Sequence, residues 1–276
     1  MRSSNTVVFC AVDDLIPVSG KPLTGFPEFL DALSETGIPY VWVTSRNRHQ
    51  LDSPIRRLGH SAPFIAEDGC AVYLPEDYFH LKPARTLRLG RFTCIPVAAP
   101  QPAAAEALDL LAEETGISVV PVRSLSPREL VQNTGLSRPE AEALRQRDFD
   151  ELFFFAGASN EDIQKFQQKA GHHKFSVRPM GTLWSLAVNA SLSTCVQELR
   201  KLYDRALHFH TFAIALATSA ASQDLERSCD RTIFLLDRSA AGDVRSHANR
   251  PAPKMIPLFS ADAWSLALEV IQRRHF

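Results

Sequence analysis

Polar side chains stand at the end of each of the first three strands that the sequence predicts. These strands are the apolar runs 6–12, 38–43 and 63–66. In an open parallel sheet, ligands bind at the carboxyl ends of the strands. The side chains that this rule brings together are Asp13, Thr44, Ser45, Arg46, Glu67 and Asp68. The hydroxyls of Thr44 and Ser45 can bond phosphate oxygens without a metal, and Arg46 can add a charge-assisted bond.

Each of these residues also has a purely structural interpretation. Thr44 and Ser45 can cap a helix that follows them. Asp13 can be a turn aspartate that fixes the shape of its loop rather than a ligand contact. Glu67 and Asp68 suit a turn that leads onward as well as they suit a binding site. The residue types alone leave both interpretations open.

The elements around these residues alternate between strand and helix. Residues 6–12, TVVFCAV, are nearly all apolar and partly β-branched, which is typical of a strand covered on both faces. A helix with apolar residues at helical spacing follows and ends at Gly37. The order strand, helix, strand, helix, strand predicts a parallel sheet with helices on its faces.

A middle block interrupts this pattern after about residue 80, where short strands mix with helices. The helices predicted in it are 103–115, 138–146 and 161–170. The alternating pattern then returns, with strands predicted at 183–188, 212–217 and 232–236. We therefore predict an α/β fold: a Rossmann-like, doubly wound parallel sheet as the core, formed by 1–84 and 185–276, and an inserted α+β cap domain at 85–184.

The order of these segments resembles the haloacid dehalogenase (HAD) superfamily with a large cap inserted after the third strand. Within it, the chain is similar to the mannosyl-3-phosphoglycerate phosphatase family, of the capped, Cof-like type. The segments IPYVWVTSR and FIAEDGCAVYLP are similar to that family's second-strand and Glu-Asn-Gly-Ala segments, and ELVQNTGLSRPEAEAL is similar to its cap helices. The similarity runs the length of the chain. It implies a phosphatase fold that uses aspartates, a lysine and magnesium.

This chain replaces most of the side chains that the family's chemistry needs. The position of the nucleophilic aspartate is Ala11, and only the second aspartate, the acid–base residue, remains, as Asp13. The lysine position falls on Leu192, and the two later carboxylate positions fall on Thr218 and Ser222. A methyl group cannot form an acyl phosphate, and magnesium prefers carboxylate oxygens. The resemblance implies magnesium, whereas these replacements predict neither a metal site nor hydrolysis.

Other residues near the family's site carry weaker expectations. The family's cap has an Arg and a His that face the sugar phosphate, whereas this chain has GTLWSLAV there, with Arg178 close by. Arg178, Glu67 and Asp68 are therefore the candidates for cap or hinge contacts. Asp224 lies two residues beyond Ser222, and we expect its helix to turn it away from a metal.

The composition argues against several other classes of protein. The chain has 276 residues, of which 45% are hydrophobic and 22% charged, with a formal net charge of −1. No global positive charge favours nucleic acid, and no apolar run approaches the length of a membrane span. The first residues, MRSSNTVVFC, do not resemble a secretion signal, and the five cysteines form no C-x-x-C pair. We therefore expect a cytoplasmic protein with reduced cysteines.

Three functional hypotheses follow. The first is a pseudophosphatase that has lost hydrolysis and binds a phosphorylated sugar, another small anion or a protein partner. The second is an active magnesium-dependent sugar-phosphate phosphatase with a rearranged site. The third is a structural or assembly subunit. If the first holds, an anion should bind at Thr44 and Ser45 between core and cap.

Overall fold

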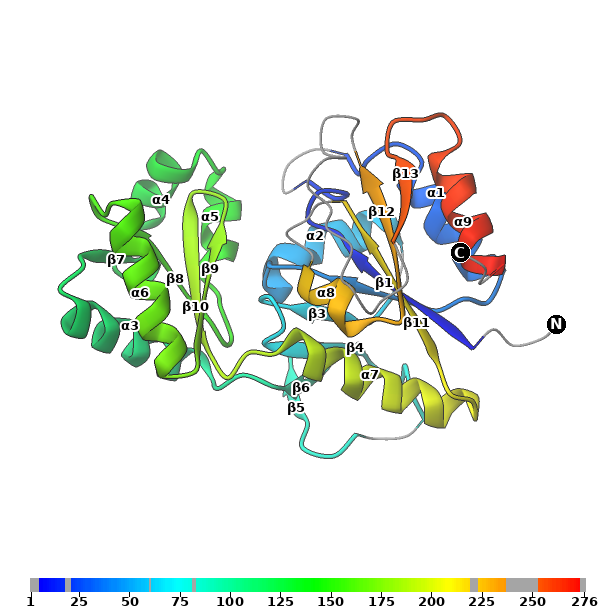
Figure 1. Cartoon of the computed structure of the whole chain (residues 1–276), viewed down its shortest axis with the longest axis horizontal. Coiled ribbons are helices and arrows are strands. Elements are labelled where there is room, and N and C mark those ends of the chain that lie inside the picture. The colour runs from blue at the N-terminus through cyan, green and yellow to red at the C-terminus, as the bar shows by residue number, and fades with distance from the viewer. Residues whose placement is uncertain are drawn as a thin grey trace.

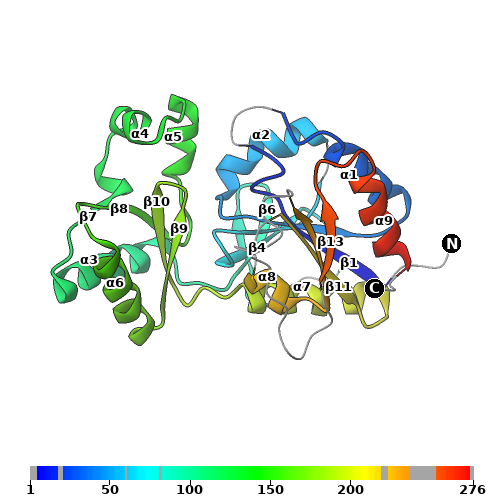
Figure 2. The same ribbon diagram turned by 45° about the horizontal axis from the view of Figure 1, so that its top comes forward.

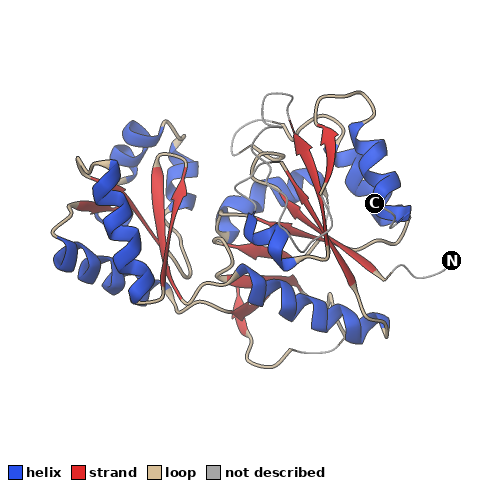
Figure 3. Cartoon of the chain, in the orientation of Figure 1, coloured by secondary structure: helices blue, strands red, loops and turns tan. Residues whose placement is uncertain are grey.

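The fold contains two β-sheets, each with helices on both faces (Figures 1 and 3). It was obtained as a computed structural model, which describes residues 5–17, 21–59, 61–80, 83–218, 223–236 and 253–273. The larger sheet, here called the core sheet, has nine strands, and the smaller, here called the cap sheet, has four. Figure 2 shows the two units side by side, joined by the chain segments that pass between them.

The core sheet has the order β13-β12-β11-β1-β2-β3-β4-β6-β5. Its strands are β1 Thr6–Ala11, β2 Tyr40–Val43, β3 Phe64–Ala66, β4 Ala71–Pro75, β5 Leu87–Leu89, β6 Phe92–Pro96, β11 Phe212–Ala217, β12 Arg231–Leu236 and β13 Lys254–Pro257. The pairs from β13 to β3 are parallel, and those from β3 to β5 are antiparallel. The central strands are apolar because helices cover both of their faces.

Two groups of helices cover the core sheet. One face packs against α1 Phe26–Glu35, α2 Arg48–Leu58 and α9 Ala263–Arg273. The other face packs against α7 Leu192–Leu207 and α8 Gln223–Ser228. Each helix turns one apolar stripe toward the sheet, which is what the helical spacing of the apolar residues predicts. The doubly wound α/β core is confirmed.

The cap sheet is antiparallel, with the order β7-β8-β10-β9. Its strands are β7 Val119–Pro121, β8 Glu151–Phe155, β9 Phe175–Met180 and β10 Leu183–Val188. One face packs against α3 Gln101–Thr115 and α6 Asn160–His172. The other face lies against the short 3₁₀ helix Val122–Ser124 and against α4 Pro127–Thr134 and α5 Arg138–Leu144. This unit is the α+β insertion expected from the sequence.

The chain passes between the core sheet and the cap sheet at positions that differ from the expected limits of the cap, 85 and 184. β5 and β6 lie within 85–184 but pair with the core sheet, where β6 runs antiparallel to β4. β10, expected to begin the return to the core, instead pairs with β8 and β9 in the cap. Antiparallel pairing with a neighbouring segment does not change the alternating pattern along the chain, so the sequence did not indicate it. The residue limits of the two domains stay a prediction.

Candidate functional site

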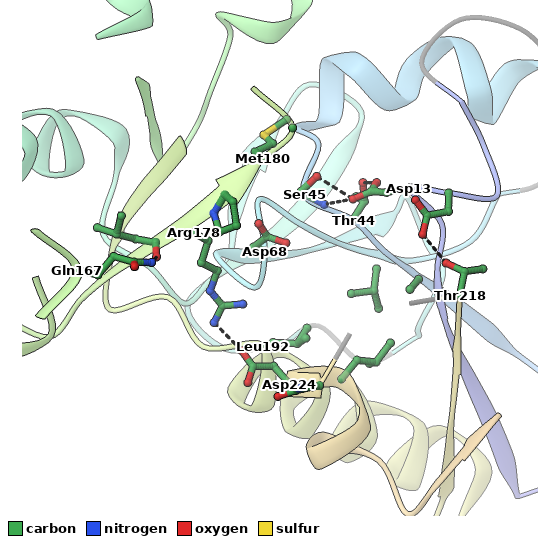
Figure 4. A pocket seen from close by; sticks show the side chains of 18 residues that line it. Asp13, Thr44, Ser45, Asp68, Gln167, Arg178, Met180, Leu192, Thr218 and Asp224 are labelled. Carbon is green, nitrogen blue, oxygen red and sulfur yellow. Dashed lines mark hydrogen bonds and ion pairs between the residues drawn. The ribbon is translucent and has the colours of Figure 1, made fainter. Parts of the chain in front are cut away.

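A cleft of about 630 Å³ lies between the core and the cap (Figure 4). The carboxyl ends of β1 and β2, the start of α7 and the helix α8 form its core wall, and β9 and α6 form its cap wall. The residues that line it include Ala11, Asp13, Asp14, Thr44, Ser45, Asp68, Gln167, Arg178, Leu192, Thr218 and Asp224. The rule that places ligands at the carboxyl ends of parallel strands therefore located the cleft correctly.

Asp13 is tied to the loop that follows β2. One carboxylate oxygen accepts a hydrogen bond from the Thr44 hydroxyl. The other accepts from the Ser45 backbone N–H at 2.8 Å and from the Ser45 hydroxyl at 2.7 Å. The two hydroxyls and the Ser45 amide that can hold a phosphate are thus already bonded to a carboxylate of the chain itself. This geometry agrees with the interpretation of Asp13 as a residue that fixes the loop.

Arg46 points inward, to Asp13, and is only 5% exposed. Its Nη2 donates to the Asp13 backbone carbonyl at 3.0 Å, and its Nε lies 3.6 Å from an Asp13 carboxylate oxygen. Burial lowers the pKa of Arg46, and the Asp13 carboxylate opposes that change. Arg46 is not part of the cleft wall, although its positive charge lies directly behind Asp13.

The helix after β2 begins later than the position of Thr44 and Ser45. Its N-cap is Asn47, whose side chain accepts from the Gln50 backbone N–H while the Gln50 side chain accepts from the Asn47 N–H. This reciprocal arrangement satisfies two amides that the first turn leaves free. The interpretation of Thr44 and Ser45 as helix caps is therefore wrong, because their loop extends to Asn47 before the helix starts.

Glu67 and Asp68 occupy the turn after β3, and both have a φ of 52°. Glu67 is 1% exposed, and its carboxylate accepts from the backbone N–H groups of three successive cap residues, Asp148, Phe149 and Asp150. Burial, followed by the nearby Asp150 carboxylate, raises the pKa of Glu67 to about 8. Glu67 therefore joins core to cap beside the cleft rather than lining it.

Asp68 does line the cleft, and the described residues give its carboxylate no hydrogen bond or ion pair (Figure 4). Burial, followed by the Asp13 carboxylate, raises the pKa of Asp68 to about 6, while Arg178 acts in the opposite direction. A carboxyl group with this pKa is mostly ionised at pH 7 and takes up a proton in mildly acidic solution.

A buried arginine completes the connection that Glu67 makes between core and cap. Arg147 forms an ion pair with Asp150, and its Nη2 donates to the Ser45 carbonyl at 2.9 Å. Its Nε lies 4.0 Å from Glu67, and Ser185 donates to Asp150 at 2.6 Å. Although burial disfavours a charged arginine, the Asp150 and Glu67 carboxylates raise the pKa of Arg147 overall.

Leu192 reaches the cleft because α7 begins against the turn after β3. A Cβ added at Gly69, whose φ is 93°, would lie 2.5 Å from the Leu192 backbone nitrogen. Only a glycine permits this close approach at that φ. The Ser191 N–H and the Cys195 thiol both donate to the Gly69 carbonyl, which fixes the first turn of α7. The side chain at position 192 is apolar, so the start of α7 brings no positive charge to the cleft.

An ion pair crosses the cleft from cap to core. Arg178 on β9 reaches Asp224 on α8 at 2.7 Å, as Figure 4 shows. Asp224 therefore faces the cleft, contrary to our expectation that its helix turns it away, because the partner that attracts it lies on the cap. The Thr218 hydroxyl donates to Asp14 at 2.6 Å. Ser222 lies outside the described residues.

The described residues do not form a magnesium site of the kind that the resemblance implies. They contain no group of three or more His, Cys, Asp or Glu side chains placed to hold a metal. The Asp13 carboxylate is engaged with Thr44 and Ser45, and Asp14 is engaged with Thr218. A hard cation needs such oxygens free and convergent. Of the cleft residues, sequence reasoning did not single out Asp14 and Gln167; the adjacency of Asp14 to Asp13 was the available signal.

No family model matches the chain. It is 27% identical over 124 residues to a glucosyl-3-phosphoglycerate/mannosyl-3-phosphoglycerate phosphatase of Methanococcoides burtonii, which covers 45% of this chain and 46% of that protein. It is 23% identical over 209 residues to a protein of the same name from Persephonella marina, covering 75% of each. The chain thus spans less than half of the first relative in that alignment.

A solved structure of a phosphatase of the haloalkanoate (HAD) enzyme superfamily, from Bacteroides thetaiotaomicron, superposes with a TM-score of 0.66. It is 16% identical and covers 99% of this chain and 97% of that one. The chain has the capped HAD fold. Among the described residues, no helix is long and apolar enough to cross a membrane.

Proposed function

We propose that this chain binds a ligand in its HAD-type cleft without hydrolysing phosphomonoesters. The observation that carries the proposal is the presence of Ala11 and Leu192 in the cleft wall. The resemblance assigns these two positions to the nucleophilic aspartate and to the lysine. A methyl group cannot attack phosphorus, and an isobutyl group cannot neutralise a phosphoryl oxygen. Phosphoryl transfer depends on charge placed at these two points.

The contacts of Asp13 support the same proposal. In the role that the resemblance gives it, this residue delivers a proton to the leaving oxygen. Its carboxylate instead accepts three hydrogen bonds from Thr44 and Ser45. These contacts hold it against the β2 loop and give it a structural task that does not require turnover.

We further propose that the ligand is a phosphorylated sugar, bound without magnesium. The names of the sequence relatives, which are phosphatases of glycosyl-phosphoglycerates, support this class. A volume of about 630 Å³ falls within the range of small-molecule sites. A ligand phosphate has to compete with Asp13 for the donors of Thr44 and Ser45. Displacement of an internal carboxylate costs free energy, so the affinity should be modest.

The absence of hydrolysis is tested by phosphate release from mannosyl-3-phosphoglycerate and from an aryl phosphate, with millimolar magnesium. We expect no release above a protein-free control. The variant Ala11→Asp should also be inactive, because Leu192 still supplies no positive charge. Magnesium-dependent release that Asp13→Asn abolishes would instead establish an active phosphatase with a rearranged site.

The binding proposal is tested by calorimetric titration with mannosyl-3-phosphoglycerate. The double variant Thr44→Val/Ser45→Ala should lose binding. Asp13→Ala should bind several-fold more tightly than the wild type, because it frees the three donors. Asp14→Ala is the matched control, because it removes the same charge from the same cleft. Asp14 accepts a hydrogen bond from Thr218, so its loss frees neither Thr44 nor Ser45. Equal effects of the two alanine variants would reduce the result to general electrostatics and refute the competition by Asp13.

A further inference from the structure

A second polar pocket, of about 290 Å³, lies on the core between α2 and the turn that joins β5 to β6. We call it the α2 pocket. Its charged lining residues are Arg48, Asp52, Arg56 and Arg91, and it also contains His49. Three guanidinium groups and one carboxylate therefore share a small volume. None of these residues belongs to the cleft.

Arg48 is held rigidly in the wall of the α2 pocket. Its Nε donates to Asp148 at 2.8 Å and its Nη2 donates to the same carboxylate at 3.4 Å. The Tyr73 hydroxyl donates to Asp148 at 2.8 Å, so the carboxylate itself is fixed. Among the described residues, none accepts a hydrogen bond from Arg48 Nη1. A guanidinium that is oriented by two of its nitrogens presents the third without a further loss of side-chain entropy.

The turn at Gly90 leaves space beside that free nitrogen. Gly90 has a φ of 61°, and a Cβ built on it would lie 3.3 Å from Arg48 Nη1. The missing side chain keeps the approach to the nitrogen open. Position 90 also brings the adjacent Arg91 over the ring of Phe92, with 5.0 Å between the guanidinium carbon and the ring centre. This contact adds a favourable interaction for Arg91 where it lines the pocket.

Positive charge in the α2 pocket is not balanced. Arg91 lies 3.2 Å from Asp52 and Arg56 lies 4.0 Å from the same carboxylate. Two arginines thus share one aspartate, while Arg48 is neutralised by Asp148 outside the pocket. Burial, followed by the charge of Arg48, lowers the pKa of His49, so the ring is neutral at pH 7 and can donate or accept a hydrogen bond.

We propose that the α2 pocket binds a small phosphate-bearing anion, at a site separate from the cleft. Planar guanidinium groups match phosphate oxygens in pairs, and Arg48, Arg56 and Arg91 approach one volume from two elements. The cleft offers the opposite environment, because its one lining arginine is paired with Asp224. A phosphate in the α2 pocket displaces Asp52 from Arg56 and Arg91 and bonds Arg48 Nη1.

Titration of the full chain with inorganic phosphate and with pyrophosphate, at low ionic strength, tests the proposal by calorimetry and by amide chemical shifts around Gly90. Arg56→Ala/Arg91→Ala should weaken pyrophosphate binding by about tenfold or more, since it removes two of the three guanidinium groups that can form charge-assisted bonds to the anion. Asp52→Asn should tighten it several-fold, because it removes the competing carboxylate. Arg88→Ala is the matched control: Arg88 is an exposed arginine on β5, paired with Glu76 and outside the pocket.

The outcomes separate this site from the cleft and from general surface charge. The amide shifts that pyrophosphate causes around Gly90 should persist in Thr44→Val/Ser45→Ala, whereas their loss in that variant places the anion in the cleft and overturns the proposal. An effect of Arg88→Ala as large as that of the Arg56/Arg91 variant also overturns it, because nonspecific attraction is then sufficient. Absence of binding of either probe at millimolar concentration overturns it as well.

Discussion

The cleft and the α2 pocket are both concave and both rich in ionisable groups, but their charges have opposite sign. The cleft is lined by Asp13, Asp14, Asp68 and Asp224, against one arginine that is already paired. The α2 pocket gathers three arginines around Asp52. The position of a cleft follows from the fold, whereas the ligand that it favours follows from the few side chains in its wall. In this chain an anion in the cleft has to displace Asp13 from its donors, whereas an anion in the α2 pocket meets an excess of arginines.

Buried Arg147 connects the loop in the cleft wall to the helix α2, which carries part of the α2 pocket. It donates to the Ser45 carbonyl on the cleft side and to the Gln50 side chain, in the first turn of α2, at 3.2 Å. The same guanidinium compensates Asp150 and faces Glu67. Because Arg147 connects the cleft loop to α2, it is the first residue to replace.

Replacement of Arg147 should have the largest effect. Arg147→Ala leaves the Asp150 carboxylate buried without its cation, which should lower the free energy of unfolding by about 3–5 kcal/mol. Urea unfolding at pH 7 measures the change. Arg88→Ala, an exposed arginine, should change it by less than about 0.5 kcal/mol. Similar values for the two variants would show that the buried network contributes no stability.

Titration of Glu67 should give the next largest effect. Its pKa is about 8 in the folded chain against an ordinary value of 4.5, so the folded state holds a proton that the unfolded state has lost between these values. Stability should therefore be greatest near pH 4.5 and fall, by an amount on the order of a few kcal/mol, as the pH rises through 8. Denaturant unfolding across this range measures it, and the slope should be shallower in Glu67→Gln. A flat profile would mean that the three backbone donors keep Glu67 ionised.

A smaller effect of the same sign is expected for Asp68 in the cleft. Its pKa is about 6, raised from 3.8, so part of the stability is lost as the pH rises from about 4 to 6. Asp68→Asn keeps the shape and removes the charge, and it should stabilise the fold at pH 7 by about 1 kcal/mol after allowance for solvent screening. Unfolding at pH 4 and pH 7 tests it, with Asp14→Asn as the control. Destabilisation at pH 7 would show that Asp68 has a favourable partner.

The ion pair across the cleft should matter least for stability. Arg178 and Asp224 are both partly exposed, at 33% and 45% of their side chains. Arg178→Ala should therefore cost no more than about 1 kcal/mol, and the cost should disappear in molar salt. The measurement is thermal unfolding at low and high salt. A larger, salt-independent loss would show that the pair holds the cap in place, and the cleft would then be closed by more than the buried network.

The sequence predicted the central strands well because short, continuous apolar runs such as those of β1 and β11 are typical of strands buried on both faces. It also predicted that the residues after β1, β2 and β3 converge. It did not predict what they do there. The bonds from Thr44 and Ser45 to Asp13 join segments more than thirty residues apart, and the local conformational propensities of these residues do not predict them. The interpretation of Thr44 and Ser45 as helix caps was wrong because Ser45 and Asn47 are equally acceptable caps by residue type, and only the reciprocal Gln50 bond distinguishes them.

Arg48 belongs to two structures at once, since it is part of the α2 pocket on the core while its other nitrogens hold Asp148 on the cap. An anion at Nη1 would bond the same planar guanidinium group that holds Asp148. If a bound anion changes the strength of the Arg48–Asp148 contact, thermodynamic reciprocity requires that contact to change the anion's affinity by the same factor. Through the nitrogens of one guanidinium group, the α2 pocket and the cap residue Asp148 are therefore in contact with the same side chain.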